Sequence, residues 1–257
     1  GYFDMKKINF MVSSSAKSEH FALWQACFDD THEEIKLFLR AADSSLLAEC
    51  RDGDELAGMA LLVPATVRGK PAYYGYAICT AEKHRKKGVC RALHEEIFRL
   101  CDAEKKGYFL HPADTGLFAM YAGFGMRLCG GCRYAEYAYS GVGLLTDAPK
   151  PRHATADDFA RDESDVRWGR GLLEYAAEPD ENGICLCFPD GALAYGEKRG
   201  DALTLSFSQE LCREHLSALC RDTACGTVKM RLNGDDTPYL MGYNLPFENL
   251  HIDFTFE

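Results

Sequence analysis

The stretch His84–Leu93, with the sequence HRKKGVCRAL, is the strongest indication of both fold and ligand in this chain. It follows a strand-like run, Ala72–Cys79, and leads into a helix-like run, Arg91–Ala103. A short loop between a strand and a helix exposes unpaired backbone N–H groups at the positive end of the helix dipole. Gly88 has no Cβ, so the backbone can approach a ligand closely there. Together these features predict a binding site for phosphate.

Charge sets this loop apart from the rest of the molecule. The loop and its edges carry five cations and no acid: Lys83, Arg85, Lys86, Lys87 and Arg91. The whole chain of 257 residues has a formal net charge of −10. A basic cluster in an acidic protein favours one local polyanionic ligand, whereas the acidic surface disfavours a nucleic-acid partner.

The composition is that of a globular protein. The apolar fraction is 47%, and the length fits one large domain or two modest ones. The chain contains neither an apolar run of transmembrane length nor a signal-peptide pattern, so we expect a cytoplasmic protein without a membrane partner.

The twelve cysteines are dispersed, and we interpret most of them as buried free thiols that act as small hydrophobes. Cys129 and Cys132 have the spacing of paired metal ligands, and Cys185 and Cys187 form a closer pair. Both pairs lie in strand-like surroundings, which argues against a zinc site and against a redox motif at a helix start. We therefore expect no metal, and a metal or redox role for Cys129 and Cys132 stays open.

The first half of the chain is predicted to alternate helices and strands. Residues Ser18–Ala42 have helical periodicity, interrupted at Asp29–Thr31. The following segments read as strand, strand, strand, helix, strand, short helix, strand and strand: Leu46–Cys50, Glu55–Val67, Pro71–Cys79, Gly88–Glu104, Tyr108–Leu110, Thr115–Tyr121, Phe124–Cys129 and Cys132–Tyr139. Because a helix separates Tyr108–Leu110 from the preceding strand, we expect those two strands to be parallel neighbours.

A polar, proline-rich segment, Thr146–Pro151, marks the predicted domain boundary, with domains at 1–145 and 146–257. Beyond it, Asp157–Tyr175 is helical in part. A three-strand meander, a helix and further strands follow: Ile184–Phe188, Ala192–Glu197, Ala202–Phe207, Gln209–Cys220, Thr227–Leu232, Tyr239–Leu245 and His251–Phe256. This order echoes the first half but lacks its basic glycine loop. The predicted fold class is α/β (α+β), with two similar halves, each a mixed, mostly antiparallel twisted sheet flanked by helices.

Two motifs carry a family resemblance. Arg85–Cys90 is similar to the pattern Arg/Gln-x-x-Gly-x-Gly/Ala, with Cys90 in place of the last small residue. Downstream, Tyr121–Gly125 is similar to a signature in which a tyrosine precedes Gly-Phe, and Asp114 replaces its usual asparagine. On these motifs, residues 18–139 resemble the GNAT superfamily of N-acetyltransferases. The full chain resembles bacterial tandem-GNAT proteins, in which a cofactor-binding half precedes a degenerate one.

The resemblance implies an acetyl-CoA-dependent acyltransferase that acts on a small-molecule or peptide amine by direct transfer in a ternary complex. The implied cofactor-binding residues are Ile78, Cys79, Thr80, Arg85, Lys86, Lys87, Gly88, Val89, Cys90, Arg91 and Asp114. Tyr121 is the implied general acid, because a phenol is protonated at neutral pH. The implied base is less defined. His111, Asp114 and Glu82 lie near the motif in sequence, and in some tandem enzymes a terminal carboxylate, here Glu257, reaches the site.

Other interpretations stay open at this point. The departures at Cys90 and Asp114 are compatible with a non-catalytic acyl-CoA-binding or sensing protein. The two-half organisation is compatible with a transferase that takes aminoacyl groups from charged tRNA, although the acidic balance argues against it. The basic loop could be solvated surface, Tyr121 a core aromatic, and Cys79 and Cys90 small space-fillers. The acceptor amine cannot be named from the sequence, and an oligomer is possible.

Overall fold

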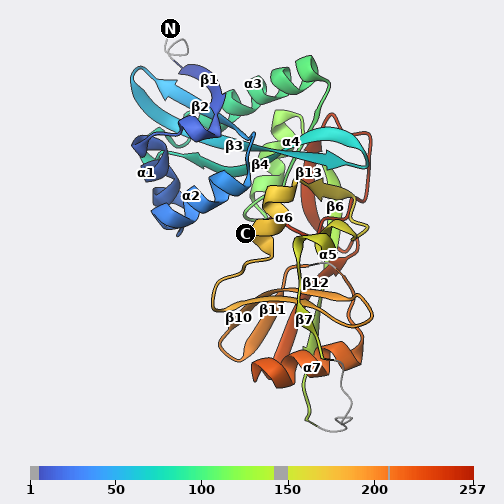
Figure 1. The fold of residues 1–257 in the computed structure, drawn as a ribbon. Helices are drawn as coiled ribbons and strands as arrows, with labels where there is room; N and C mark the ends of the chain where they lie inside the picture. Colours follow the sequence, from blue (N-terminus) through green and yellow to red (C-terminus); the bar gives the residue numbers. More distant parts are fainter. Residues whose placement is uncertain (1–5, 142–149, 208) are drawn as a thin grey trace. The chain divides into compact units, whose positions relative to one another are not determined.

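The computed structural model describes residues 6–141, 150–207 and 209–257 (Figure 1). Its contacts fall into two compact units. The first comprises Gly1–Cys129 and Leu240–Glu248, and the second comprises Gly130–Tyr239 and Asn249–Glu257. The predicted boundary between residues 145 and 146 lies outside the described residues, so the division into two domains at that point stays a prediction.

The first unit is built on one sheet whose strands lie in the order β1-β2-β3-β4-β5-β13. The bounds are β1 Lys6–Val12, β2 Leu46–Asp52, β3 Glu55–Val67, β4 Lys70–Thr80, β5 Gly107–Leu110 and β13 Thr237–Tyr243. All neighbours are antiparallel except β4 and β5, which are parallel as predicted. Strand β1 was not predicted. Strand β13 was predicted as part of the second half, but its residues Met241–Tyr243 pair with β5.

Helices cover both faces of this sheet (Figure 1). Their bounds are α1 Ser18–Cys27, α2 His32–Ala41, α3 Val89–Glu104 and α4 Leu117–Phe124, with short 3-10 turns at Ser13–Ser15 and Glu82–His84. Trp24 and Ile35 of α1 and α2 meet Leu61 of β3 on one face. Leu93 and Ile97 of α3 pack against the opposite face. Successive residues of a strand therefore contact helices on opposite faces of the sheet.

The break between the first two helices is confirmed at Thr31. Its Oγ1 accepts a hydrogen bond from the Glu34 N–H at 3.2 Å, and the Glu34 carboxylate accepts one from the Thr31 N–H at 2.6 Å. This capping box satisfies two backbone donors that the start of α2 would otherwise leave without partners.

The second unit contains the strand order β6-β12-β11-β10-β9-β7. The bounds are β6 Arg127–Ala138, β7 Arg152–His153, β9 Gly183–Cys187, β10 Leu193–Arg199, β11 Ala202–Leu205 and β12 Thr227–Asn233, with helices α5 Ala156–Ala160, α6 Arg170–Ala176 and α7 Arg213–Thr223 and a short strand β8, Val166–Trp168. Strands β11 and β12 are parallel and α7 connects them. The connection β9-β10-β11-α7-β12 thus repeats the connection β2-β3-β4-α3-β5.

Two strand predictions were wrong. Residues Phe124–Cys129 and Cys132–Tyr139 were expected to be separate strands, but Phe124 ends α4 and a single strand, β6, begins at Arg127. The two glycines do not interrupt it. Gly131 is needed because a Cβ there would lie 3.0 Å from the backbone of Asp235 and of its neighbours.

The other wrong strand is His251–Phe256, which forms no ladder in the structure. The carbonyls of Ile252 and Asp253 accept hydrogen bonds from the buried guanidinium of Arg231 instead of from a strand partner. Phe254 packs edge-on against Phe159, with ring centroids 4.9 Å apart. The apolar pattern of the segment therefore reflects burial, not pairing.

The predicted fold class is confirmed, because the structure is a mixed α/β fold in which helices flank a large mixed sheet. Among the described residues, none of the helices has both the length and the apolar character needed to cross a membrane.

Candidate functional site

Strand β4 carries a β-bulge near its end. Cys79 pairs with Met59, whereas Tyr76 pairs with Leu61, so two residues of β4 oppose one residue of β3. Ala77 lies in this bulge with φ +49°, a left-handed conformation that costs a non-glycine residue about 1 kcal/mol. Bulges of this kind re-aim a strand and are common beside active sites.

Strands β4 and β5 stop pairing before β4 ends. Their register joins Ala72–Tyr74 to Gly107–Phe109, and β5 ends at Leu110. Strand β4 continues to Thr80 with β3 as its paired neighbour. The edge of β4 that contains Ile78, Cys79 and Thr80 therefore has no β5 partner. An unpaired strand edge offers N–H and C=O groups to an extended ligand.

The basic loop follows directly and ends at the start of α3. Lys86 and Gly88 both have left-handed φ values, +60° and +76°, and Gly88 is the residue that precedes the first helical turn. Arg85, Lys86, Lys87 and Gly88 are exposed. A Cβ at Gly88 would meet only the Lys6 ammonium, at 3.5 Å. The space in front of the helix is thus open, and the first turn contains no acid. This is the geometry of an anion cradle.

Acidic residues of the β2–β3 hairpin bind the first residues of the loop. Glu55 accepts hydrogen bonds from Lys83 at 2.6 Å and from His84 at 3.0 Å, and the carboxylate of Asp52 lies 3.6 Å from the other ring nitrogen of His84. The Lys83 side chain is therefore committed to the hairpin. Sequence analysis did not single out Glu55, because nothing in its local pattern distinguishes it from a turn acid.

Glycine at position 58 sets how closely α3 approaches β3. A Cβ on Gly58 would lie 2.5 Å from Cγ1 of Val89 and 3.0 Å from the carbonyl oxygen of Cys79. A Cβ there would require the Val89 side chain or the backbone at Cys79 to shift. The close contact fixes the first turn of α3 beside the bulged part of β4.

Tyr121 and Cys90, one from each motif, lie together. Tyr121 is on α4 and only 4% exposed, and its hydroxyl lies beside the Cys90 thiol. Burial raises the pKa of Tyr121 well above its usual value, and burial raises the pKa of Cys90 to about 12. Both groups are therefore protonated at neutral pH.

A buried histidine lies beneath this pair and was missed by sequence analysis. Nδ1 of His94 donates to the carbonyl of Cys90 at 2.8 Å, so Nε2 accepts from the hydroxyl of Tyr108 at 3.0 Å. Burial lowers the pKa of His94 to about 4, which keeps the ring neutral. The one sequence signal was its position four residues after Cys90, on the same face of α3.

Two further predicted residues tie α4 into place. Oδ1 of Asp114 accepts a hydrogen bond from the Gly116 N–H at 2.9 Å, in the turn just before α4. The guanidinium of Arg91 donates to the carbonyl of Gly123 at 3.3 Å and lies 4.9 Å from the ring centroid of Phe124. The side chains of Asp114 and Arg91 thus position α4, which carries Tyr121.

The candidate bases are not brought together. Glu82 is exposed at the start of the turn after β4, and His111 is half-buried just after β5. Glu257 belongs to the second unit. Its role as a base stays a prediction.

Neither cysteine pair forms a metal centre in the described residues. Cys129 and Cys132 are three residues apart on the continuous strand β6, so their side chains point to opposite faces. The densest group of possible ligands in the described part of the chain joins Glu19, His20 and Glu49. The Arg51 guanidinium is already paired with Glu19 and with Glu49, which it meets at 2.9 Å, and it neutralises the site that a cation would take.

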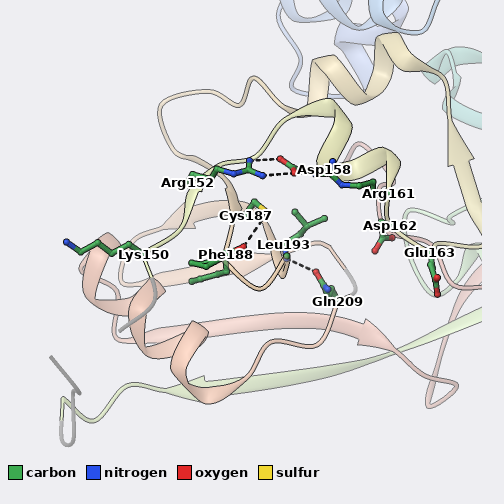
Figure 2. Close-up of a pocket in the computed structure, with 12 residues that line it drawn as sticks. Lys150, Arg152, Asp158, Arg161, Asp162, Glu163, Cys187, Phe188, Leu193 and Gln209 are labelled. Atoms are coloured by element: carbon green, nitrogen blue, oxygen red, sulfur yellow. Dashed lines mark hydrogen bonds and ion pairs between the residues drawn. The ribbon is translucent and has the colours of Figure 1, made fainter. Parts of the chain in front are cut away.

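The second unit contains a cavity of about 710 Å³ that sequence analysis did not anticipate (Figure 2). Phe188 and Leu193 contribute apolar surface. Charged side chains also line the cavity. Arg152 makes two hydrogen bonds to Asp158, at 2.7 and 2.8 Å, and Arg161 pairs with the same carboxylate. The two arginines are thus engaged within the wall of the cavity.

Comparison with known proteins agrees with the geometry of the first unit. Residues 10–126 match the acetyltransferase (GNAT) family. Over this segment, which is slightly less than half of the chain, the protein is similar to GNAT acetyltransferases. Members of this family are acyltransferase enzymes, and the matched segment contains β4, its bulge, the basic loop, α3 and α4. A search of curated protein sequences found no match.

Solved structures share the fold over nearly the whole chain. A GCN5-related N-acetyltransferase from Kribbella flavida is 14% identical, with a TM-score of 0.66, over 93% of this chain and 71% of that one. Eis1 from Mycobacterium abscessus is 14% identical, with a TM-score of 0.60, over 88% and 65%. A putative acetyltransferase from Pyrococcus horikoshii is 12% identical, with a TM-score of 0.60, over 99% and 94%. At such identities the likeness shows the fold alone.

Proposed function

We propose that the chain is a member of the GNAT family, and that its first unit transfers an acetyl group from acetyl-CoA to an amine of a small molecule or peptide, directly and within a ternary complex. The observation that carries this proposal is the succession of three features along one stretch. The β4 bulge at Ala77, the unpaired edge at Ile78–Thr80 and the cradle at Gly88 follow one another without a break. An extended arm that ends in a pyrophosphate fits such a succession.

Each feature would bind a different part of the cofactor. The N–H groups between Lys86 and Arg91 would hold the pyrophosphate at the helix start. The edge of β4 at Ile78–Thr80 would pair with the amides of the pantetheine arm. Acetyl-CoA would supply a thioester carbonyl that is open to attack by an amine.

Tyr121 would provide the proton for the departing thiolate. Burial keeps its phenol protonated, and its hydroxyl lies beside the sulfur of Cys90. The departing sulfur of the cofactor would accept a hydrogen bond from this hydroxyl during the reaction. The neutral His94 ring, with its centroid 5.3 Å from that of Tyr121, packs against the phenol and fixes its position.

The proposed general base is the carboxylate of Glu257, with His111, Asp114 and Glu82 as the alternatives. The structural role of Asp114 in the turn before α4 makes it the weakest of these. We also propose that the second unit is a degenerate copy of the GNAT fold, supported by the repeated order of three strands, helix and strand. A cytoplasmic location, the absence of a nucleic-acid partner and a possible oligomer remain predictions from the sequence.

Calorimetry and product analysis together test the proposal. Titration of the purified protein with acetyl-CoA should show binding, and incubation with a panel of primary amines should yield acetylated product by mass spectrometry. Lack of binding at millimolar cofactor would overturn the proposal. Binding without any product across a broad panel would favour the non-catalytic sensing protein instead.

A further inference from the structure

A pair of thiols lies beside the basic loop and has no part in the proposed transfer chemistry. Cys27 is the last residue of α1 and is half-buried, and Cys79 lies on β4 just after the bulge. Sγ of Cys27 is 4.0 Å from the carbonyl oxygen of Thr80, the residue after Cys79. The Cys79 thiol is a close enough neighbour to act on the Cys27 sulfur. The end of α1 is thus seated directly on this part of β4.

Arg85 completes the cluster. Its guanidinium lies beside the Cys27 sulfur and adds a positive charge there. The carboxylate of Asp30, three residues after Cys27, accepts a hydrogen bond from Trp24 Nε1 at 2.8 Å. The groups that act on Cys27 are therefore a thiol donor on β4 and a cation at the start of the basic loop. A thiolate next to an arginine is the reactive form of cysteine.

We propose that Cys27 is an oxidation site that forms a disulfide with Cys79 on reaction with a hydroperoxide. In the first step the Cys27 thiolate attacks the peroxide, an S–O bond forms, the O–O bond breaks and the alkoxide or hydroxide leaves with a proton. The sulfur of Cys27 becomes a sulfenic acid. In the second step the Cys79 sulfur attacks it, an S–S bond forms, and hydroxide leaves with the Cys79 proton as water. One peroxide is reduced and two thiols are oxidised.

The electrostatics fit this division of roles. The hydrogen bond from Cys79 and the charge of Arg85 lower the pKa of Cys27 to about 6, whereas the neighbouring Cys27 and burial raise the pKa of Cys79 well above its usual range. Cys27 is thus the attacking thiolate, and Cys79 is the resolving thiol that stays protonated until a sulfenic acid forms beside it. Cys79 is 6% exposed, so peroxide in solution reaches Cys27 first.

Mass spectrometry on the intact chain tests the reactivity of Cys27. Iodoacetamide labelling is followed as a function of pH, and tryptic peptide 18–36, which contains only this cysteine, is quantified. The labelling rate should be half-maximal near pH 6, against about 8.5 for an ordinary thiol. The exposed Cys212 is the internal reference. Arg85→Gln should move the midpoint of Cys27 upward and leave Cys212 unchanged.

Peroxide treatment tests the disulfide itself. Non-reducing digestion of oxidised protein should yield peptide 18–36 linked to peptide 69–83, which contains only Cys79. Cys79→Ser retains a hydrogen-bond donor but not the resolving sulfur, so the reaction should stop at a sulfenic acid that dimedone traps on Cys27. A Cys27 labelling midpoint no lower than that of Cys212, or no linked peptide from the oxidised wild-type protein, would overturn the proposal.

Discussion

At the scale of single residues, burial sets the protonation states of the groups in the candidate site. Tyr121, Cys90 and His94 are packed against one another, and each is in its neutral form near pH 7. A neutral phenol can give a proton to a leaving thiolate, whereas the ring of His94 cannot act as a cation there. The proposed transfer chemistry would therefore rest on the hydroxyl of Tyr121.

Replacing Tyr121 by phenylalanine removes that hydroxyl and little volume. We expect Tyr121→Phe to lower kcat by about 100-fold or more, as loss of a general acid does, and to change the Kd for acetyl-CoA by less than about threefold, since the cradle is distant in sequence and made of backbone. Steady-state kinetics and calorimetry measure the two effects. Full turnover in the variant would remove Tyr121 from the mechanism.

Gly88 permits a comparison between backbone strain and ligand binding. Gly88→Ala forces a side chain into φ +76°, which we expect to cost about 1 kcal/mol of stability and at least about tenfold in acetyl-CoA affinity. Gly53→Ala is the matched control, because Gly53 has φ +62° in a hairpin turn with nothing near its Cβ position. It should lose similar stability in urea unfolding but keep its affinity. Equal affinities for the two variants would contradict the cradle.

Asp162, in the second unit, makes stability depend on pH. Burial and the hydrogen-bonded carboxyl of Asp253 raise its pKa to about 8, although Arg167 acts in the other direction. Because the folded-state pKa lies above the usual value of 3.8, the stabilising contribution is complete below about pH 4 and is lost as pH rises through 8.

Asp162→Asn removes this titration and keeps an N–H donor for Asp253. We therefore expect the variant to raise Tm relative to wild type at pH 8.5 by more than at pH 5, in thermal unfolding followed by circular dichroism. Asp157→Asn is the opposite control, because Arg170 lowers the pKa of Asp157 and its charge is favourable at high pH. A change in Tm that is the same at both pH values for Asp162→Asn would show that the carboxyl pair is not coupled.

At the scale of elements, the position of α3 determines the shape of the loop. The first turn of α3 contacts β3 at Gly58, where the added Cβ of any other residue would meet Val89 and the backbone of Cys79. The helix dipole, the left-handed Gly88 and the β4 bulge are held in one arrangement by this contact.

Gly58→Ala should therefore weaken cofactor binding without touching the cofactor. We expect a loss of about 1–3 kcal/mol of stability from overpacking and a lower acetyl-CoA affinity, measured by urea unfolding and calorimetry. Gly69→Ala, at an open hairpin turn with φ +81°, controls for glycine replacement on the same sheet. Unchanged affinity in Gly58→Ala would mean that α3 tolerates displacement.

Local patterns predicted most of this element structure. The bounds of β3 and the pairing of β4 with β5 followed from periodicity and connection order. The bulge did not, because Ala77 has no sequence signal for a left-handed φ. His94 was also missed, since a lone histidine on an apolar helix face does not show that its hydrogen bonds reach Tyr108.

At the scale of the molecule, chain order and spatial order differ. Strand β13 pairs with β5 although β5 ends at Leu110. The Tyr243 ring stacks on Phe98 of α3 with centroids 4.1 Å apart, and its hydroxyl donates to Asp102. Sequence reasoning could not place β13 in the first unit, because an apolar strand pattern does not identify its partner.

The first unit should therefore not be stable as an N-terminal fragment. We expect a chain of residues 1–139 to show weak or no cooperative unfolding, and a fusion of 1–139 to 237–248 through a short Gly/Ser linker to recover it. Circular dichroism during thermal unfolding compares the two. If the shorter fragment unfolds cooperatively with the same Tm as the fusion, β13 is dispensable for this unit.

The late arrival of β13 also has a consequence for synthesis in the cell. Strand β5 leaves the ribosome about 130 residues before β13, the strand that pairs with its other edge. At about 5–20 residues per second, this leaves the edge of β5 open for roughly 7–26 s. During that interval the edge is a template for pairing with other nascent chains. The first unit is thus completed only after β13 has been synthesised, and a chain that terminates before β13 would carry the basic loop on an unfinished sheet.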